Sequence, residues 1–164
     1  MSTTLSLRNT SETKRLIRRD ALERLAERIC TGEHISDNVE ISLLLCDDDY
    51  MTQLNYHYRN KRGPTDVLSF EQESPPGQAT RLLGDVVISL ETANRACQGD
   101  RKKMRQEVDL LFCHGLLHLL GYDHANKRQE QEMKCRQAQY LGLPEHDAWP
   151  THSANGAAKR RARR

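Results

Sequence analysis

Three histidines lie close together in the segment HGLLHLLGYDH, which spans residues 114–124. His114 and His118 are four residues apart, so on a helix both imidazoles project from one face and can reach a single ion. Gly121 can end such a helix, after which the chain can turn and bring His124 back toward the pair. The sequence therefore predicts one zinc ion per chain, held by three histidines with an open fourth position, an arrangement typical of catalysis.

A histidine pair in an apolar helix has an alternative interpretation, because two such residues are more often buried with their hydrogen bonds satisfied inside the core. The glycine and the third histidine follow His114 by seven and ten residues. Chance completion of that whole pattern is on the order of one in a thousand. Burying two neutral imidazoles among leucines also costs desolvation unless their nitrogens are occupied. The pattern therefore favours a metal site.

Gly115 stands where the metzincin protease motif HExxHxxGxxH has its glutamate. In proteases that carboxylate takes a proton from water at the metal and passes it to the leaving amine. A metal without this base still acts as a Lewis acid and still lowers the pKa of a water molecule to roughly 7. The motif therefore disfavours peptidase chemistry and favours a substrate that accumulates negative charge, such as a phosphodiester.

The elements that must position these histidines predict an α/β (α+β) fold, with a small mixed sheet covered by helices in a single hydrolase domain at residues 1–150. Alternating apolar residues predict strands at 39–46, at 82–90 and at the end of 59–71. Helical spacing predicts helices at 13–30, 47–58, 91–98, 101–120 and 126–142. The fourth of these helices is nearly all apolar from Leu110 onward, so we expect a buried central helix that carries two of the three histidines.

Composition and charge narrow the function. The 164 residues contain no apolar run long enough to span a membrane and no secretory signal, which predicts a cytoplasmic protein without a membrane partner. The cysteines are odd in number and lie mostly in apolar patterns, so we expect reduced core residues. They are Cys30, Cys46, Cys97, Cys113 and Cys135.

Basic residues are distributed unevenly along the chain. The net charge is +2, but five basic residues lie in the last six positions, and without them the chain has 20 basic and 23 acidic residues. Contacts with nucleic acid must therefore come from local patches. Residues 151–164 are predicted to be a disordered basic tail that either binds RNA or is merely solvated. A cationic face on the helix at 13–30 has the same two interpretations, and its members are Lys14, Arg15, Arg18 and Arg19.

Three segments resemble one known family. HGLLHLLGYDH closely resembles the signature HGxLHLxGYDH of the bacterial YbeY proteins, which are metal-dependent endoribonucleases implicated in ribosomal RNA maturation and ribosome quality control. LNYHYRNKRGPTDVLSFE (54–71) and LLGDVVIS (82–89) are similar to two further blocks of that family. The resemblance covers roughly residues 40–142. It implies cleavage of single-stranded RNA in ribosomal RNA processing, including maturation of the small-subunit 3′ end. It also implies the ribosomal small subunit, and a ribosome-associated GTPase or ribosomal protein, as partners.

The resemblance also implies roles for individual residues. His114, His118 and His124 would be the zinc ligands, and His114 would be catalytic together with Arg59, a cationic residue near the metal. A guanidinium can hold a phosphate by two hydrogen bonds and stabilise the charge that develops on it. Two further cations extend this patch toward RNA, namely Lys61 and Arg62. Three carboxylates either support the metal site or serve turns and backbone bonding, namely Asp66, Asp85 and Asp123.

The sequence leaves the reaction and two other functions open. Water activated by the metal could attack phosphorus, or the ribose 2′-hydroxyl could attack and leave a cyclic phosphate; we predict the former. A zinc peptidase or amidase would need a carboxylate from elsewhere, such as Asp85 or Glu107. A ribosome-associated RNA-binding factor with a weakly active zinc site is the third possibility. The oligomeric state is not predicted.

Overall fold

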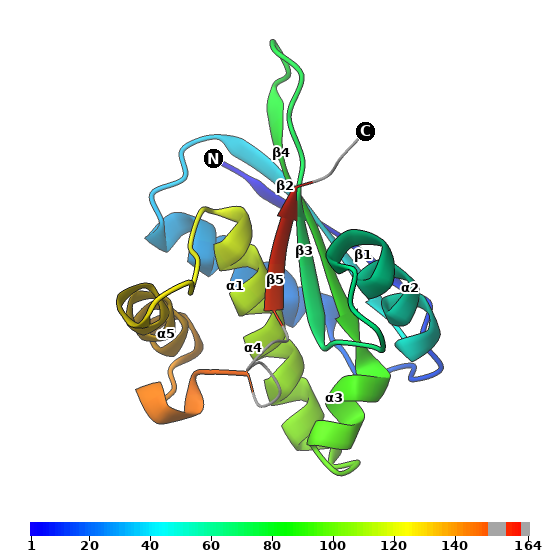
Figure 1. Cartoon of the computed structure of the whole chain (residues 1–164). Coiled ribbons are helices and arrows are strands. Elements are labelled where there is room, and N and C mark those ends of the chain that lie inside the picture. Colours follow the sequence, from blue (N-terminus) through cyan, green and yellow to red (C-terminus); the bar gives the residue numbers. More distant parts are fainter. Residues whose placement is uncertain (151–156, 162–164) are drawn as a thin grey trace.

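A mixed five-stranded sheet forms the middle of the domain in the computed structural model, which describes residues 1–150 and 157–161 (Figure 1). Its strands, in the spatial order β1-β2-β4-β3-β5, are β1 (Thr3–Asn9), β2 (Asn38–Cys46), β4 (Thr80–Ser89), β3 (Val67–Glu71) and β5 (Ala157–Arg161). β1, β2 and β4 run parallel to one another, β3 is antiparallel to β4, and β5 is parallel to β3. The α+β fold with a small mixed sheet is confirmed.

The helices lie on both faces of this sheet (Figure 1). They are α1 (Arg19–Gly32), α2 (Asp48–Arg59), α3 (Leu90–Ala96), α4 (Arg101–Leu119) and α5 (Lys127–Leu141), followed by a short 3-10 helix, η1 (Glu145–Asp147). Alternation along β4 identifies the two faces. Val86 and Ile88 belong to the main apolar cluster with residues of α1 and α4, whereas Val87 belongs to a second cluster with Met51 of α2. α4 and α2 therefore cover opposite faces.

α4 is the buried central helix that the sequence predicts. Its N-terminus is capped by Asp100, whose Oδ1 accepts a hydrogen bond of 3.0 Å from the backbone N–H of Lys103. The first turn is exposed, but every residue from Leu110 to Leu119 is buried. This half of α4 is apolar on all sides because it packs against the sheet, α1 and α5.

Gly115 allows α4 to approach the sheet closely. A Cβ atom at this position would lie 2.7 Å from Cγ1 of Val86 and 3.0 Å from Oγ of Ser69. The Ser69 hydroxyl donates a hydrogen bond of 3.1 Å to the carbonyl of Gly115. The residue at the position of the protease base thus faces β3 and β4.

The N-terminal region differs from the prediction in two ways. Strand β1 was not expected, because only Leu5 of its seven residues is buried and an edge strand so polar has no clear alternation. The first helix begins at Arg19 rather than at residue 13. Arg15 adopts a φ of 61°, which is incompatible with an α-helix, and Leu16 turns inward to pack with Met104.

The predicted cationic helix face is therefore wrong. Lys14 precedes the helix and donates to the carbonyl of Asn9, while Arg18 pairs with Asp20 and Arg19 with Glu23. These ion pairs neutralise much of the local positive charge.

Two other expectations have mixed outcomes. The five cysteines are free and four of them are buried, but Cys135 is exposed on α5, where its thiol donates to a carboxylate oxygen of Glu145. Of the predicted disordered tail, residues 151–156 and 162–164 lie outside the described residues, and 157–161 are described as β5, so its disorder stays a prediction. Within the described residues, no helix combines the length and the apolar character needed to cross a membrane.

Candidate metal centre

The three predicted histidines meet at the C-terminal end of α4. One ring nitrogen from each of His114, His118 and His124 can be chosen so that all three atoms lie within 4.8 Å of one another. His114 and His118 are 0% and 1% exposed. Gly121 has a φ of 107° and lets the chain reverse after the helix. Asp123 then accepts a hydrogen bond of 2.8 Å from the backbone N–H of His124, which fixes the turn.

Hydrogen bonds fix the tautomers of the two buried rings. Nδ1 of His114 lies 2.7 Å from Oε1 of Gln137, and Nδ1 of His118 lies 2.9 Å from the carbonyl oxygen of Tyr122. The amide of Gln137 is oriented by its own N–H group, which donates to the carbonyl of Ala148. Because both partners of the rings are acceptors, each Nδ1 must carry the proton, and each Nε2 presents a lone pair.

The remaining nitrogens point toward a common position. The Nε2 atoms of His114 and His118 are 3.2 Å apart, so two lone pairs face each other with no proton between them. Nε2 of His124 is buried and has no hydrogen-bond partner among the described residues. Two nitrogens at the zinc–nitrogen distance and a tetrahedral angle lie about 3.3 Å apart. The spacing of the His114 and His118 nitrogens matches this value, and an ion held by them would also give the buried His124 nitrogen a partner.

Electrostatics also favours the neutral, metal-binding form of the His114 ring. Burial lowers the pKa of His114 well below its ordinary value, and the neighbouring His118 and His124 oppose a further positive charge there. A neutral imidazole is the form that coordinates a metal. The site is therefore ready to bind an ion at neutral pH without first losing protons from this ring.

Trp149 closes one side of the cluster and was not predicted. Its ring stands edge-on to His114 and to His124, with centroid distances of 5.0 and 5.3 Å. The segment that carries it leaves α5 at Gly142, where φ is 66°, and returns toward α4 through η1. Nζ of Lys134 lies 5.9 Å from the centre of the Trp149 ring. The Trp149 ring thus contacts two of the three histidines and lies near the Lys134 ammonium group.

Comparison with known proteins assigns the family. A family profile described as endoribonuclease YbeY matches residues 6–143. The chain belongs to the YbeY family.

Individual relatives support this assignment over most of their length. An endoribonuclease YbeY from Aquifex aeolicus is 43% identical over 124 residues, which cover 76% of this chain and 81% of the relative. An endoribonuclease YbeY from Pelotomaculum thermopropionicum is 40% identical over 125 residues, which cover 74% of this chain and 82% of the relative. A solution structure of a protein from Thermotoga maritima superposes with a TM-score of 0.53 at 27% identity, covering 84% of this chain and 87% of that one.

The basic residues expected in this YbeY chain lie near the end of α2. Arg59 is its last residue, and its guanidinium donates to Oδ1 of Asn55 at 3.4 Å. Lys61 and Arg62 are exposed in the loop that follows. α2 packs on the sheet face opposite α4, so these residues belong to a different layer from the histidines. Their catalytic and RNA-binding roles stay predictions.

The three carboxylates have separate surroundings. Asp85 lines a pocket on the α2 face with Tyr58 and Phe70 and accepts a hydrogen bond of 2.9 Å from Gln72, so the structure does not bring it to the histidines. Burial raises its pKa. Asp66 is buried and accepts a bond of 2.8 Å from the backbone N–H of Val67. Of the three, Asp123 is the carboxylate beside the cluster, where it holds the turn before His124.

Replacing Gln137 with leucine is expected to weaken metal binding about 10- to 100-fold, the usual effect of losing a partner that orients a metal-ligating histidine. Leucine cannot accept a hydrogen bond from Nδ1–H of His114, so the tautomer of that ring is no longer fixed. Competition with a chromophoric chelator measures the affinity. Gln139→Leu, an exposed position two residues away, is the control. Equal affinities of the two variants would contradict the assigned role of Gln137.

The metal-free protein is expected to become less stable as the pH falls below about 6.5, the ordinary pKa of histidine. Below that pH the unfolded chain binds a proton at residue 114 that the folded chain does not, so unfolding is favoured by up to about 1.4 kcal/mol per pH unit. Asp109, whose pKa is raised to about 6 by burial, acts in the opposite direction. Urea unfolding of wild type and His114→Gln at several pH values isolates the histidine contribution. An identical pH dependence in both proteins would refute it.

Proposed function

We propose that this chain is a metal-dependent endoribonuclease that cleaves single-stranded RNA during ribosomal RNA processing, including maturation of the small-subunit 3′ end. The observation that carries this proposal is the convergence of three histidine nitrogens with fixed or unpartnered lone pairs at one position. Its relatives are named endoribonucleases, which supplies the substrate class. We further propose the ribosomal small subunit, with a ribosome-associated GTPase or ribosomal protein, as partner in the cytoplasm.

Zinc is the ion that three neutral imidazoles favour in a tetrahedral site. When bound, such an ion would supply Lewis-acid stabilisation of a phosphoryl oxygen and would lower the pKa of a water molecule. The protein's own contribution is to hold His114, His118 and His124 in place and to exclude a protease base, since Gly115 faces the sheet. No observation favours the peptidase or the binding factor.

Cationic side chains complete the proposal on the substrate side. Arg59, Lys61 and Arg62 lie within four residues of one another at the end of α2 and in the loop that follows. Phosphate contacts made by such groups weaken steeply with salt. RNA binding is therefore proposed to depend on this loop and on ionic strength.

Cleavage of a single-stranded ribosomal RNA precursor tests the proposal. Wild-type protein with defined zinc content is compared with chelator-treated protein, zinc-restored protein and an Arg59→Glu variant, with exposed Arg105→Glu as the control. Cleavage that disappears on chelation, returns with zinc and is reduced in Arg59→Glu supports the assignment. Cleavage that persists after full metal removal would overturn it.

The ends of the products test the mode of attack. Hydrolysis by water leaves no cyclic phosphate, whereas attack by the ribose 2′-hydroxyl does. We propose hydrolysis, and mass spectrometry of the 3′ ends of the fragments distinguishes the two. A 2′,3′-cyclic phosphate would refute the hydrolytic mode and leave the endoribonuclease assignment intact.

A further inference from the structure

Glu33 lies directly after α1 and receives hydrogen bonds from two tyrosines. Its Oε1 accepts from the hydroxyl of Tyr122 at 2.9 Å, and its Oε2 accepts from the hydroxyl of Tyr140. Nε of Arg136 lies 3.8 Å from Oε2, and the Glu33 side chain is 13% exposed. A largely buried carboxylate with this set of donors joins three separate parts of the chain: the end of α1, the turn after α4, and α5.

The partners of Glu33 belong to the segments that orient the metal-binding histidines. Tyr122 provides the carbonyl that accepts the Nδ1 proton of His118. Arg136 and Tyr140 flank Gln137 on α5, and Gln137 accepts the Nδ1 proton of His114. The Glu33 carboxylate thus forms hydrogen bonds with side chains of both segments that orient the histidines: the turn that contains Tyr122, and helix α5, which carries Gln137.

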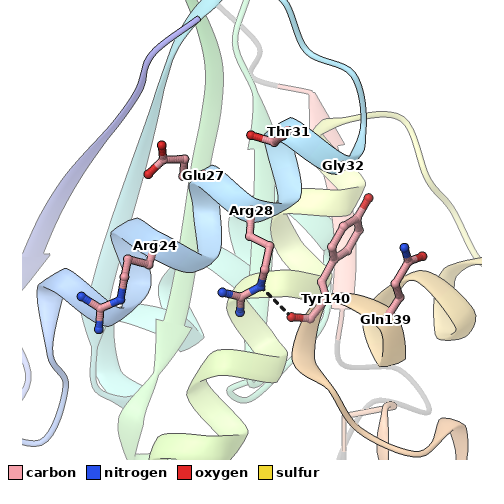
Figure 2. A pocket seen from close by; sticks show the side chains of 7 residues that line it. All are labelled: Arg24, Glu27, Arg28, Thr31, Gly32, Gln139 and Tyr140. Carbon is pink, nitrogen blue, oxygen red and sulfur yellow. Dashed lines mark hydrogen bonds between the residues drawn. The ribbon is translucent and has the colours of Figure 1, made fainter.

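The contact between α1 and α5 at this point is tight. Figure 2 shows the Tyr140 ring beside the last turn of α1, with Arg28 donating to the Tyr140 carbonyl at 3.0 Å. A Cβ atom at Gly32 would lie 2.4 Å from Cε1 of that ring. The glycine allows Tyr140 to reach this position, and Glu33, the next residue, bonds its hydroxyl. Contacts with the end of α1 and with Glu33 therefore hold Tyr140 in position.

We propose that Glu33 is a positioning residue for the metal centre: by accepting both phenol hydroxyls it holds the Tyr122 carbonyl and α5 where they orient His118 and His114. This inference rests on the metal site of the proposed function. A carboxylate accepts from both phenols at once, and hydrogen bonds to a charged acceptor are stronger than neutral ones. A glutamine in its place keeps one acceptor oxygen and presents an N–H group to the other phenol.

The test compares Glu33→Gln with Glu27→Gln, an exposed glutamate on α1. Zinc affinity is measured by chelator competition, and the geometry of the site is read from the visible absorption of Co²⁺ bound in place of zinc. Glu33→Gln is expected to bind zinc more weakly, by less than the roughly 10- to 100-fold expected for the direct partner Gln137, and to alter the Co²⁺ spectrum, whereas Glu27→Gln leaves both unchanged. Wild-type affinity and spectrum in a folded Glu33→Gln variant would overturn the proposal.

Tyr122→Phe provides a milder second variant, because it removes the hydroxyl that bonds Glu33 and keeps the carbonyl that bonds His118. It is also expected to weaken zinc binding. The fold-loss of zinc affinity in the double variant Glu33→Gln/Tyr122→Phe should be smaller than the product of the two single fold-losses. If the two fold-losses multiply, Glu33 and Tyr122 do not act on the metal site through the hydrogen bond between them. If wild type itself binds no zinc, the proposed function fails; if wild type binds zinc and Glu33→Gln equals it, only this inference fails.

Discussion

A Gly115→Glu variant, which completes the protease motif, is expected to lose its fold rather than to gain peptidase activity. The Cβ atom alone would lie 2.7 Å from Val86 and 3.0 Å from Ser69. Overpacking of this kind costs about 1–3 kcal/mol, and a carboxylate buried against the sheet without a partner costs several more. The sum, on the order of 5 kcal/mol, is comparable with the total stability of a typical domain. Thermal unfolding and circular dichroism measure the loss.

Two further variants make this test decisive. Gly115→Ala adds the clash without the charge. Its overpacking cost of about 1–3 kcal/mol is offset by a gain of about 1 kcal/mol in helix propensity, so a net loss of up to about 2 kcal/mol is expected. Gln106→Glu places the same residue on the exposed face of α4 and should change stability by no more than about 0.5 kcal/mol. A Gly115→Glu variant that melts like wild type would show that this face of α4 is not held against β3 and β4.

The sequence predicts the clustering of the three histidines because their spacing is a local property. His114 and His118 share a helix face through periodicity alone, and Gly121 signals the turn that returns His124. The apolar run from Leu110 likewise predicts burial of that helix without knowledge of its neighbours. Such features are encoded within a few residues, so no alignment or structure is needed to infer them.

The groups that orient the ligands could not be predicted, since they are brought together only by tertiary packing. Gln137 is one of several glutamines on a polar helix, and nothing local marks it as the one that is buried. The Tyr122 carbonyl is a backbone atom that every residue has. β1 escaped prediction for a related reason, because a strand at the sheet edge with a single buried residue has little alternation to detect.

The packing of α4 explains why a glycine directly after His114 is compatible with the three-histidine cluster. In α4 the residue after His114 faces the sheet, so the ligands and the packing contact occupy different faces of one helix. Close approach of α4 to the sheet fixes the positions of the histidine backbones, and α5 and the turn after α4 fix their rings. A glycine at position 115 thus lets α4 pack closely on the sheet and leaves the chain without the carboxylate that the protease motif carries there.

A His124→Ala variant is expected to lose at least about a thousandfold of the RNA-cleaving activity, which corresponds to about 4 kcal/mol of transition-state stabilisation. His124 is the cleanest ligand to remove, because its Nε2 makes no hydrogen bond among the described residues and the bond from its backbone N–H to Asp123 survives the change. The fold should therefore be retained, and zinc affinity should fall because only two of the three histidines remain. The control is His146→Ala, which removes a histidine that is 79% exposed on η1. Activity, zinc affinity and thermal unfolding are measured on both variants. Undiminished cleavage by a folded His124→Ala protein that no longer binds zinc would show that the reaction does not use the metal centre.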